Sequence, residues 1–198
     1  MSSDRKKRVI IGISGATGAI FGVRLLQMLR SMPDWETHLV TSDAGVLTVR
    51  QEVGWSQARL REEADQTHNI KDIAAPIASG SYRCEAMIVA PCSMRSLSAI
   101  ARSSSDNLLT RAADVILKER RKLVLMARET PLTAAHIENM AQVTNMGGII
   151  CPPVPAFYML PTTIDELVNH TCIRVLDLLN VEQEYAGRWA GLNFNTKS

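Results

Sequence analysis

Hydroxyl and arginine side chains stand directly after several apolar runs of the sequence, where they could bind an anion. The polar stretches at these positions are residues 14–18, Ser42 with Asp43, and residues 91–96, 128–131 and 152–158. In one of them a carboxylate, Glu129, directly follows the guanidinium of Arg128. A guanidinium can hold a phosphate through two parallel hydrogen bonds. The set therefore suits an anionic ligand better than a ribose.

The first of these stretches belongs to "RVIIGISGATGAIFG", residues 8–22, which predicts a strand, a glycine loop and a helix. Such a loop usually holds a phosphate, because backbone N–H groups and the helix dipole attract anions there. The glycines fall at Gly12, Gly15 and Gly18, and Ser14 stands where the dinucleotide fingerprint G-x-G-x-x-G has its middle glycine. A glycine loop alone does not identify the ligand.

A dinucleotide-dependent epimerase or reductase of the short-chain type would carry a similar "GATG" loop, together with a Tyr-x-x-x-Lys pair for proton transfer. The chain has no such pair, because its tyrosines and the residues four positions later are Tyr82 with Ala86, Tyr158 with Thr162, and Tyr185 with Trp189. Asp43 could bind a ribose, but it is as easily the N-cap of a helix. The dinucleotide interpretation is disfavoured.

The elements that must position these residues follow from hydrophobic periodicity. Strand-like apolar runs cover residues 8–13, 37–42, 86–91, 122–127 and 147–152, and helical segments lie between them. The last long helix is expected to open at a capping box of Thr163 with Glu166 and to run to about Asn180. Residues 55–80 are the least periodic part. Nearly continuous apolar strands that alternate with helices indicate a parallel sheet covered on both faces.

The predicted fold is therefore α/β, a doubly wound Rossmann-like (flavodoxin-like) parallel sheet. A chain of 198 residues with 46% apolar residues has room for one such domain. We expect a single domain over residues 1–198, in which residues 181–198 form a C-terminal tail.

Composition disfavours several other classes of protein. Lys and Arg number 22 against 20 Asp and Glu, and the charges are interspersed, so no basic face indicates nucleic acid. No apolar stretch reaches the roughly 18 residues of a spanning helix, and a signal-peptide core is missing. We expect a cytoplasmic protein without a membrane partner. The four cysteines lack C-x-x-C spacing and are expected to be reduced, and the four histidines show no metal-ligand spacing.

Four ordered stretches together resemble the UbiX-type flavin prenyltransferases, in particular those encoded with hydroxyarylic acid decarboxylases. They read "GISGATGAIFG", "APCSMRSLSAIA", "DNLLTRAADVILKERRKLVLMARETPL" and "PPVPAFY", and the resemblance reaches to about Trp189. These enzymes belong to the homo-oligomeric flavin-containing cysteine decarboxylase superfamily. The resemblance implies that the protein binds FMN and joins its reduced form to the dimethylallyl group of dimethylallyl phosphate. The product, prenylated FMN, would serve a UbiD-type decarboxylase.

The resemblance also implies the roles of individual residues. The expected FMN site consists of Gly15, Ala16, Thr17, Ser42, Ser93, Met94, Arg95, Ser96 and Arg128. The allylic phosphate would be held by Tyr158, Arg174, Lys118 and Arg111. Glu129 is the candidate acceptor for the flavin N5 proton, Glu52 is a second candidate carboxylate, and Trp189 could stabilise allyl-cation character. No metal is expected, because cationic side chains can cover a leaving monophosphate. In the family the site is completed across subunit boundaries, which implies a large homo-oligomer, expected to be a dodecamer.

Structural interpretations of the same residues remain open. Arg111, Lys118 and Arg174 fall on predicted helices, where a lone cation is usually a solvated surface residue. Trp189 could only anchor the C-terminal segment, and Arg128 with Glu129 could form a structural ion pair. Cys92 invites a nucleophile hypothesis, but a small buried thiol at a strand end is favoured.

Two other functions remain as alternatives. A flavin-dependent cysteine decarboxylase of the same superfamily would carry a catalytic His after the first helix and a P-x-M-N-x-x-M-W motif. The chain has no His between Gly18 and His38 and reads "PPVPAFYML" in place of the motif, so this alternative is weak. A non-enzymatic flavin-binding subunit of a decarboxylase complex would bind FMN but release no phosphate from an allylic substrate.

Overall fold

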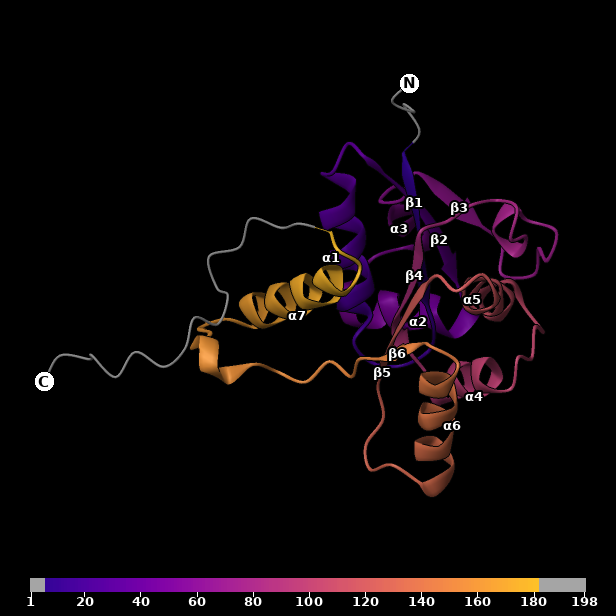
Figure 1. Ribbon diagram of the computed structural model, residues 1–198. Helices are drawn as coiled ribbons and strands as arrows, with labels where there is room; N and C mark the ends of the chain where they lie inside the picture. Colours follow the sequence, from indigo (N-terminus) through magenta and orange to yellow (C-terminus); the bar gives the residue numbers. More distant parts are fainter. Residues whose placement is uncertain (1–5, 182–198) are drawn as a thin grey trace, which may run out of the picture.

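The computed structural model describes residues 6–181 and shows a six-stranded sheet in which every pair of neighbouring strands is parallel (Figure 1). The strand order is β3-β2-β1-β4-β5-β6. The strands are β1 (Lys7–Ile13), β2 (Trp35–Thr41), β3 (Gln66–His68), β4 (Ala86–Cys92), β5 (Lys122–Ala127) and β6 (Ile149–Ile150). The predicted doubly wound parallel sheet is therefore confirmed.

One strand was not predicted from the sequence. β3 lies within residues 55–80, the part without periodicity, and its three residues Gln66, Thr67 and His68 are polar. It is an edge strand that pairs with β2 alone, so it needs no apolar run of the kind that buried central strands show. The last predicted strand, 147–152, is shorter than expected and covers only Ile149–Ile150.

Seven α-helices and two short 3₁₀-helices connect the strands over the described residues. They are α1 (Ala19–Arg30), α2 (Asp43–Val53), α3 (Gln57–Arg61), η1 (Pro76–Ala78), α4 (Met94–Ala101), α5 (Leu108–Lys118), α6 (Ala134–Asn145), η2 (Phe157–Met159) and α7 (Ile164–Leu178). The capping box of Thr163 and Glu166 at the start of α7 is present as predicted. No helix within residues 6–181 is long and apolar enough to cross a membrane.

The helices divide the core into two clusters, one on each face of the sheet. In the first cluster, Val9 and Ile11 of β1 pack with Leu25 of α1 and Val175 of α7. The second cluster joins alternate residues of the strands, such as Ile10 and Met87, to α4, α5 and α6; its helical members include Leu97, Leu109, Ile116 and Val143. The helices α5 and α7 therefore cover opposite faces of the sheet (Figure 1).

Polar contacts attach α7 to the rest of the chain. The Arg24 guanidinium on α1 donates hydrogen bonds to Asn169 and Asp165 on α7. Near the other end of the helix, the Lys122 ammonium donates to the Leu178 carbonyl at 2.7 Å. Val181, where the tail was expected to begin, is buried in the first core cluster, so the packed region extends one residue further than predicted. The remainder of the expected tail, residues 182–198, lies outside the described residues.

A pair of histidines, the buried His38 and the partly buried His68, joins β3 to β2. His38 Nδ1 and His68 Nε2 are 2.9 Å apart, and their rings stack with centroids separated by 5.2 Å. Glu36 Oε1 lies 3.4 Å from His38 Nε2. Burial lowers the pKa of His38 from 6.5 to about 4, and it also lowers the pKa of His68. The imidazole pair is therefore neutral at neutral pH and fixes the edge strand by hydrogen bonding.

The histidine pair predicts a loss of stability in acid. Because the pKa of folded His38 lies below that of the unfolded chain, its contribution is complete above pH 6.5 and falls as the pH drops toward about 4. The loss from this residue amounts to about 3 kcal/mol, at 1.36 kcal/mol for each unit of pKa. Urea unfolding of the wild type and of His38→Gln between pH 7 and 4 measures it. The variant should show the flatter pH dependence, and two parallel curves would contradict the prediction.

Candidate functional site

The carboxyl ends of β1 and β4 mark the point at which the strand order reverses, and in such sheets ligands bind outside this point. Ser14, which follows β1, joins the two strand ends. Its hydroxyl donates to the Pro91 carbonyl at 3.0 Å and accepts from the Ser93 amide at 2.8 Å, and its own amide donates to the Pro91 carbonyl at 3.2 Å. Ser14 is 1% exposed. It acts as a structural tie that fixes the loop 14–18 against the loop at the end of β4.

The loop 14–18 rests directly on the first turn of α2. A Cβ atom added to Gly15 would lie 2.4 Å from the Ala44 Cβ, so the Gly15 backbone lies close against the Ala44 side chain. Gly18 adopts a left-handed conformation with φ +99°, which lets the chain turn into α1. The predicted residues Gly15, Ala16 and Thr17 are thereby held between the ends of β1 and β4 and helix α2.

Glu52, a candidate catalytic carboxylate, caps α1. Its Oε2 accepts hydrogen bonds from the amides of Gly18 and Ala19, both at 2.9 Å. Gly18 has no side chain with which to cap the helix, and a carboxylate at a helix N-terminus is favoured by the helix dipole. The structure thus gives Glu52 a structural role beside the loop, which the sequence did not indicate.

Ser42 forms the N-cap of α2. Its hydroxyl accepts from the Gly45 amide at 3.0 Å, and its amide donates to the Ile13 carbonyl at 3.0 Å. The suggestion that Asp43 caps this helix is therefore wrong, because Asp43 is already the first helical residue. Ser42 lies at the carboxyl end of β2, beside the end of β1, where the resemblance places it in the FMN site.

The N-terminus of α4 carries a second set of predicted residues. Ser93 is its N-cap and accepts a hydrogen bond from the Ser96 amide at 3.3 Å, and Met94 and Arg95 form the first turn. The Arg128 amide donates to the Cys92 carbonyl at 3.2 Å, which places Arg128 next to the start of α4. Within residues 6–181 neither Arg95 nor Arg128 forms an ion pair, and both are exposed.

The two helix N-termini at this edge of the sheet differ in electrostatics. The first amides of α1 already bind the carboxylate of Glu52, so a second anion there would meet a negative charge. The start of α4 has Arg95 in its first turn and Arg128 on the neighbouring strand end, so the positive end of the helix dipole is reinforced by two guanidinium groups. Both helix starts belong to the predicted FMN site, and α4 is the one that carries an arginine in its first turn.

The remaining predicted catalytic residues are placed as follows. Glu129 is exposed, and its Oε1 accepts a hydrogen bond from the Thr130 amide at 3.0 Å. Arg128 and Glu129 form no ion pair in the described structure, so that structural interpretation is wrong. Trp189 lies outside the described residues.

The thiol beside this site is not activated. Cys92 is fully buried, and burial raises its pKa to about 12, so the nucleophilic thiolate is essentially absent at neutral pH. All four cysteines are free. Within the described part of the chain, no group of three or more His, Cys, Asp or Glu side chains is placed to hold a metal ion.

The four residues predicted to hold the allylic phosphate fall into two groups on opposite faces of the sheet. The Tyr158 hydroxyl on η2 lies 3.5 Å from His170 Nε2 on α7, and Arg174 follows one turn later and pairs with Asp177 at 2.8 Å. Helix α5 on the other face carries Arg111 and Lys118. A single chain therefore does not bring the two groups together.

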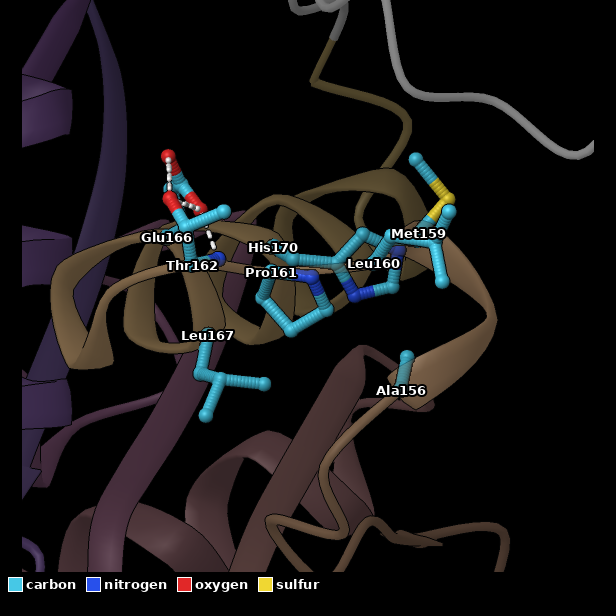
Figure 2. A pocket seen from close by; sticks show the side chains of 8 residues that line it. All are labelled: Ala156, Met159, Leu160, Pro161, Thr162, Glu166, Leu167 and His170. Atoms are coloured by element: carbon cyan, nitrogen blue, oxygen red, sulfur yellow. Dashed lines mark hydrogen bonds between the residues drawn. The ribbon is translucent and has the colours of Figure 1, made fainter.

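The groups also differ in their surroundings. On α5, the Arg111 guanidinium donates to the Ala78 carbonyl at 3.2 Å and pairs with Asp114 at 3.0 Å, and Lys118 pairs with Glu119 at 2.5 Å. Beside Tyr158, a pocket of about 220 Å³ lies between α7 and the segment before it (Figure 2). Its lining consists of Ala156, Met159, Leu160, Pro161, Thr162, Glu166, Leu167 and His170.

Comparison with known proteins gives concordant results. Residues 1–175 match the Flavoprotein family. The flavin prenyltransferase UbiX of Salmonella typhimurium is 52% identical over 187 residues, which cover 93% of this chain and 99% of that protein. The crystal structure of AnUbiX in complex with FMN and dimethylallyl pyrophosphate matches with a TM-score of 0.93 and 46% identity, over 96% of this chain and all of that one. A dodecameric FMN-dependent UbiX-like decarboxylase from Escherichia coli O157:H7 matches with a TM-score of 0.91 and 50% identity, over 93% of this chain and all of that one.

The contact of Gly15 with Ala44 yields a prediction for stability. Gly15→Ala should destabilise the fold by about 1–3 kcal/mol, because the added methyl group overlaps the Ala44 Cβ. Ala44→Gly removes that overlap, so the double variant should be more stable than the sum of the two single changes predicts. Urea unfolding of all four proteins measures the coupling. Strictly additive effects would show that the loop does not rest on α2 in this way.

Proposed function

Because the chain belongs to the Flavoprotein family and, within it, to the UbiX-type flavin prenyltransferases, we propose that it joins a dimethylallyl group from dimethylallyl phosphate to reduced FMN. The observation that carries this proposal is the similarity itself. About half of the residues are identical over nearly the whole chain, and the same fold in AnUbiX binds FMN with dimethylallyl pyrophosphate.

The residues at the switch point fit FMN. The phosphate of FMN is a dianion, and the start of α4 offers it a helix N-terminus with Arg95 and Arg128 close by. In this proposal Ser93, Met94, Arg95, Ser96 and Arg128 hold the phosphate. The residues Gly15, Ala16, Thr17 and Ser42, at the ends of β1 and β2, hold the rest of the flavin. Reduced FMN supplies a nucleophilic N5 atom, which bonds to the allylic carbon as the C–O bond to phosphate breaks.

The chain's own residues act mainly through charge. As the C–O bond breaks, negative charge develops on the leaving phosphate, and preorganised donors stabilise such charge effectively. Arg111, Lys118 and Arg174 supply cations for this purpose, and Tyr158 supplies a hydroxyl donor. Glu129 is exposed and not paired with Arg128, so its carboxylate is available to accept the proton of flavin N5. Trp189 would offer an aromatic face to allyl-cation character.

This use of the cations requires more than one copy of the chain. Arg111 and Lys118 lie on α5, whereas Tyr158 and Arg174 lie with α7 on the opposite face of the sheet, so we propose that neighbouring subunits contribute one group each. Apolar side chains stand exposed around Tyr158, with Leu160 83% and Ile164 80% exposed. Such exposure is typical of a protein interface. A dodecamer like that of the Escherichia coli O157:H7 relative would bury these residues and complete the site.

The product would be prenylated FMN, and we propose a UbiD-type decarboxylase as its recipient. A non-enzymatic flavin-binding subunit would share the FMN site but would not need cations for a second phosphate. A cysteine decarboxylase remains the weaker alternative, because "PPVPAFYML" stands in place of that class's motif.

The proposal predicts a defined product. Anaerobic incubation of the protein with reduced FMN and dimethylallyl phosphate should yield a flavin heavier by one prenyl group, detected by mass spectrometry, with release of one phosphate. Arg128→Ala should weaken FMN binding by tenfold or more, since it removes a charge-assisted contact worth about 1.5–3 kcal/mol. Cys92→Ala should leave turnover per bound flavin nearly unchanged, because its buried thiol is protonated.

The product assay and the Cys92→Ala variant each have a result that would contradict the proposal. FMN binding without any prenylated flavin or released phosphate would indicate a carrier rather than an enzyme. Loss of turnover in a folded Cys92→Ala protein that still binds FMN would indicate covalent catalysis by the thiol.

A further inference from the structure

His170 is a buried histidine whose side chain faces a residue of the proposed substrate site. It is 8% exposed, and its ring meets the Tyr158 ring edge-on, with centroids 5.9 Å apart and planes at 87°. The Tyr158 hydroxyl lies 3.5 Å from His170 Nε2. Figure 2 shows the His170 ring beside Leu160 and Pro161, in the pocket between α7 and residues 156–162. Sequence analysis assigned this histidine no role.

The protonation state of His170 restricts what its Nε2 atom can do. Burial lowers the pKa of His170, and the nearby charge of Arg174 lowers it further, although Asp177 opposes this effect. The ring is therefore neutral at pH 7, with one nitrogen a donor and the other an acceptor. If Nε2 is the acceptor, it takes the hydroxyl proton of Tyr158. If Nε2 carries the proton, it donates to the Tyr158 oxygen, and the hydroxyl proton points away from His170.

A phosphate selects the second arrangement. Phosphate oxygens accept hydrogen bonds, so Tyr158 can serve the allylic phosphate only by donating its own proton. We propose that His170 is a positioning residue, which donates from Nε2 to the Tyr158 oxygen and thereby directs the Tyr158 hydroxyl proton toward the allylic phosphate. This inference rests on the proposed function. Consecutive hydrogen bonds of this kind polarise one another, which strengthens the donor at the end of the chain.

The attachment of α7 supports a positioning role. Arg24 joins α7 to α1 through Asp165 and Asn169, which precede His170 on the same helix, and the Cys172 thiol donates to the Phe21 carbonyl at 3.6 Å. The imidazole is thus mounted on a helix fixed to the core. The Tyr158 segment is less buried: η2 has no buried residue, and Tyr158 itself is 51% exposed. A histidine on a packed helix is thus placed to orient the more exposed tyrosine.

A double-mutant cycle tests this inference through the binding of dimethylallyl phosphate, without any catalytic turnover. Four proteins are compared: the wild type, His170→Leu, Tyr158→Phe and the double variant. Each is loaded with oxidised FMN, which cannot be prenylated, and is titrated calorimetrically with dimethylallyl phosphate. His170→Leu should weaken binding about tenfold, as expected when a hydrogen bond to a charged group is misdirected. In the Tyr158→Phe background the same change should have no further effect, because the hydroxyl through which His170 acts is absent.

A matched variant separates positioning from packing. His170→Gln keeps a side-chain N–H donor and should retain most of the affinity for dimethylallyl phosphate, whereas a purely structural His170 would make Gln and Leu equally harmful. The Kd for FMN and the melting temperature of each variant report on folding. With reduced FMN, His170→Leu should lower kcat/KM for dimethylallyl phosphate, because the Tyr158 hydroxyl also donates to the phosphate as its negative charge develops.

Three results would overturn the inference. In the first, His170→Leu lowers the affinity for dimethylallyl phosphate equally with Tyr158 and with Phe at position 158. In the second, His170→Gln folds but does not restore binding, and in the third the wild type itself does not bind dimethylallyl phosphate. Wild-type binding with the predicted coupling but without prenylated flavin would instead refute the proposed reaction and leave the role of His170 intact.

Discussion

The parallel sheet keeps α5 and α7 on opposite faces, and this separation governs how the chain can perform its chemistry. Each helix is held by its own apolar cluster, with Leu109 and Ile116 of α5 on one side and Val168 and Val175 of α7 on the other. The cations on the two helices cannot meet without unpacking one of the clusters. A site that uses both must therefore be built between copies of the chain, and the exposed apolar residues around Tyr158 are suited to such a boundary.

At the carboxyl edge of the sheet, the distribution of charge distinguishes two similar helix starts. Both α1 and α4 follow strands at the switch point. The Glu52 carboxylate caps the N-terminus of α1, whereas Arg95 and Arg128 lie near the N-terminus of α4. The glycine loop before α1 is anchored by Ser14 and by the close approach of Gly15 to Ala44, while Gly15 and Thr17 stay exposed. The start of α4, which follows the neighbouring strand β4, carries Arg95 in its first turn.

Hydrophobic periodicity predicted the features that depend on local sequence. The central strands and the capping box of α7 were correct, because continuous burial and helix capping both leave a local pattern. The edge strand β3 was missed, since a short strand paired on one side can be wholly polar. The sequence suggested Asp43 as the cap of α2, whereas the structure has Ser42 in that place.

Contacts between distant residues could not be predicted in this way. Ser14 and Pro91 are 77 positions apart, and Glu52 lies 34 positions from Gly18, so neither pairing leaves a periodic signal. The same limit applies to His170 and Tyr158, whose contact depends on how the segment 156–162 folds back on α7. The division of the cations between two faces follows from the packing of α5 and α7, which the alternation of strands and helices did not specify.

The measurement that tests this account most directly is complementation between two inactive variants. One chain carries Arg111→Ala with Lys118→Ala, the other carries Tyr158→Phe with Arg174→Ala, and the two are co-expressed so that oligomers contain both. Mixed oligomers, verified by mass spectrometry, should regain part of the wild-type rate of flavin prenylation, because some boundaries then combine an intact α5 group with an intact α7 group. Mixed oligomers as inactive as either parent would contradict a site shared between the two faces of neighbouring chains.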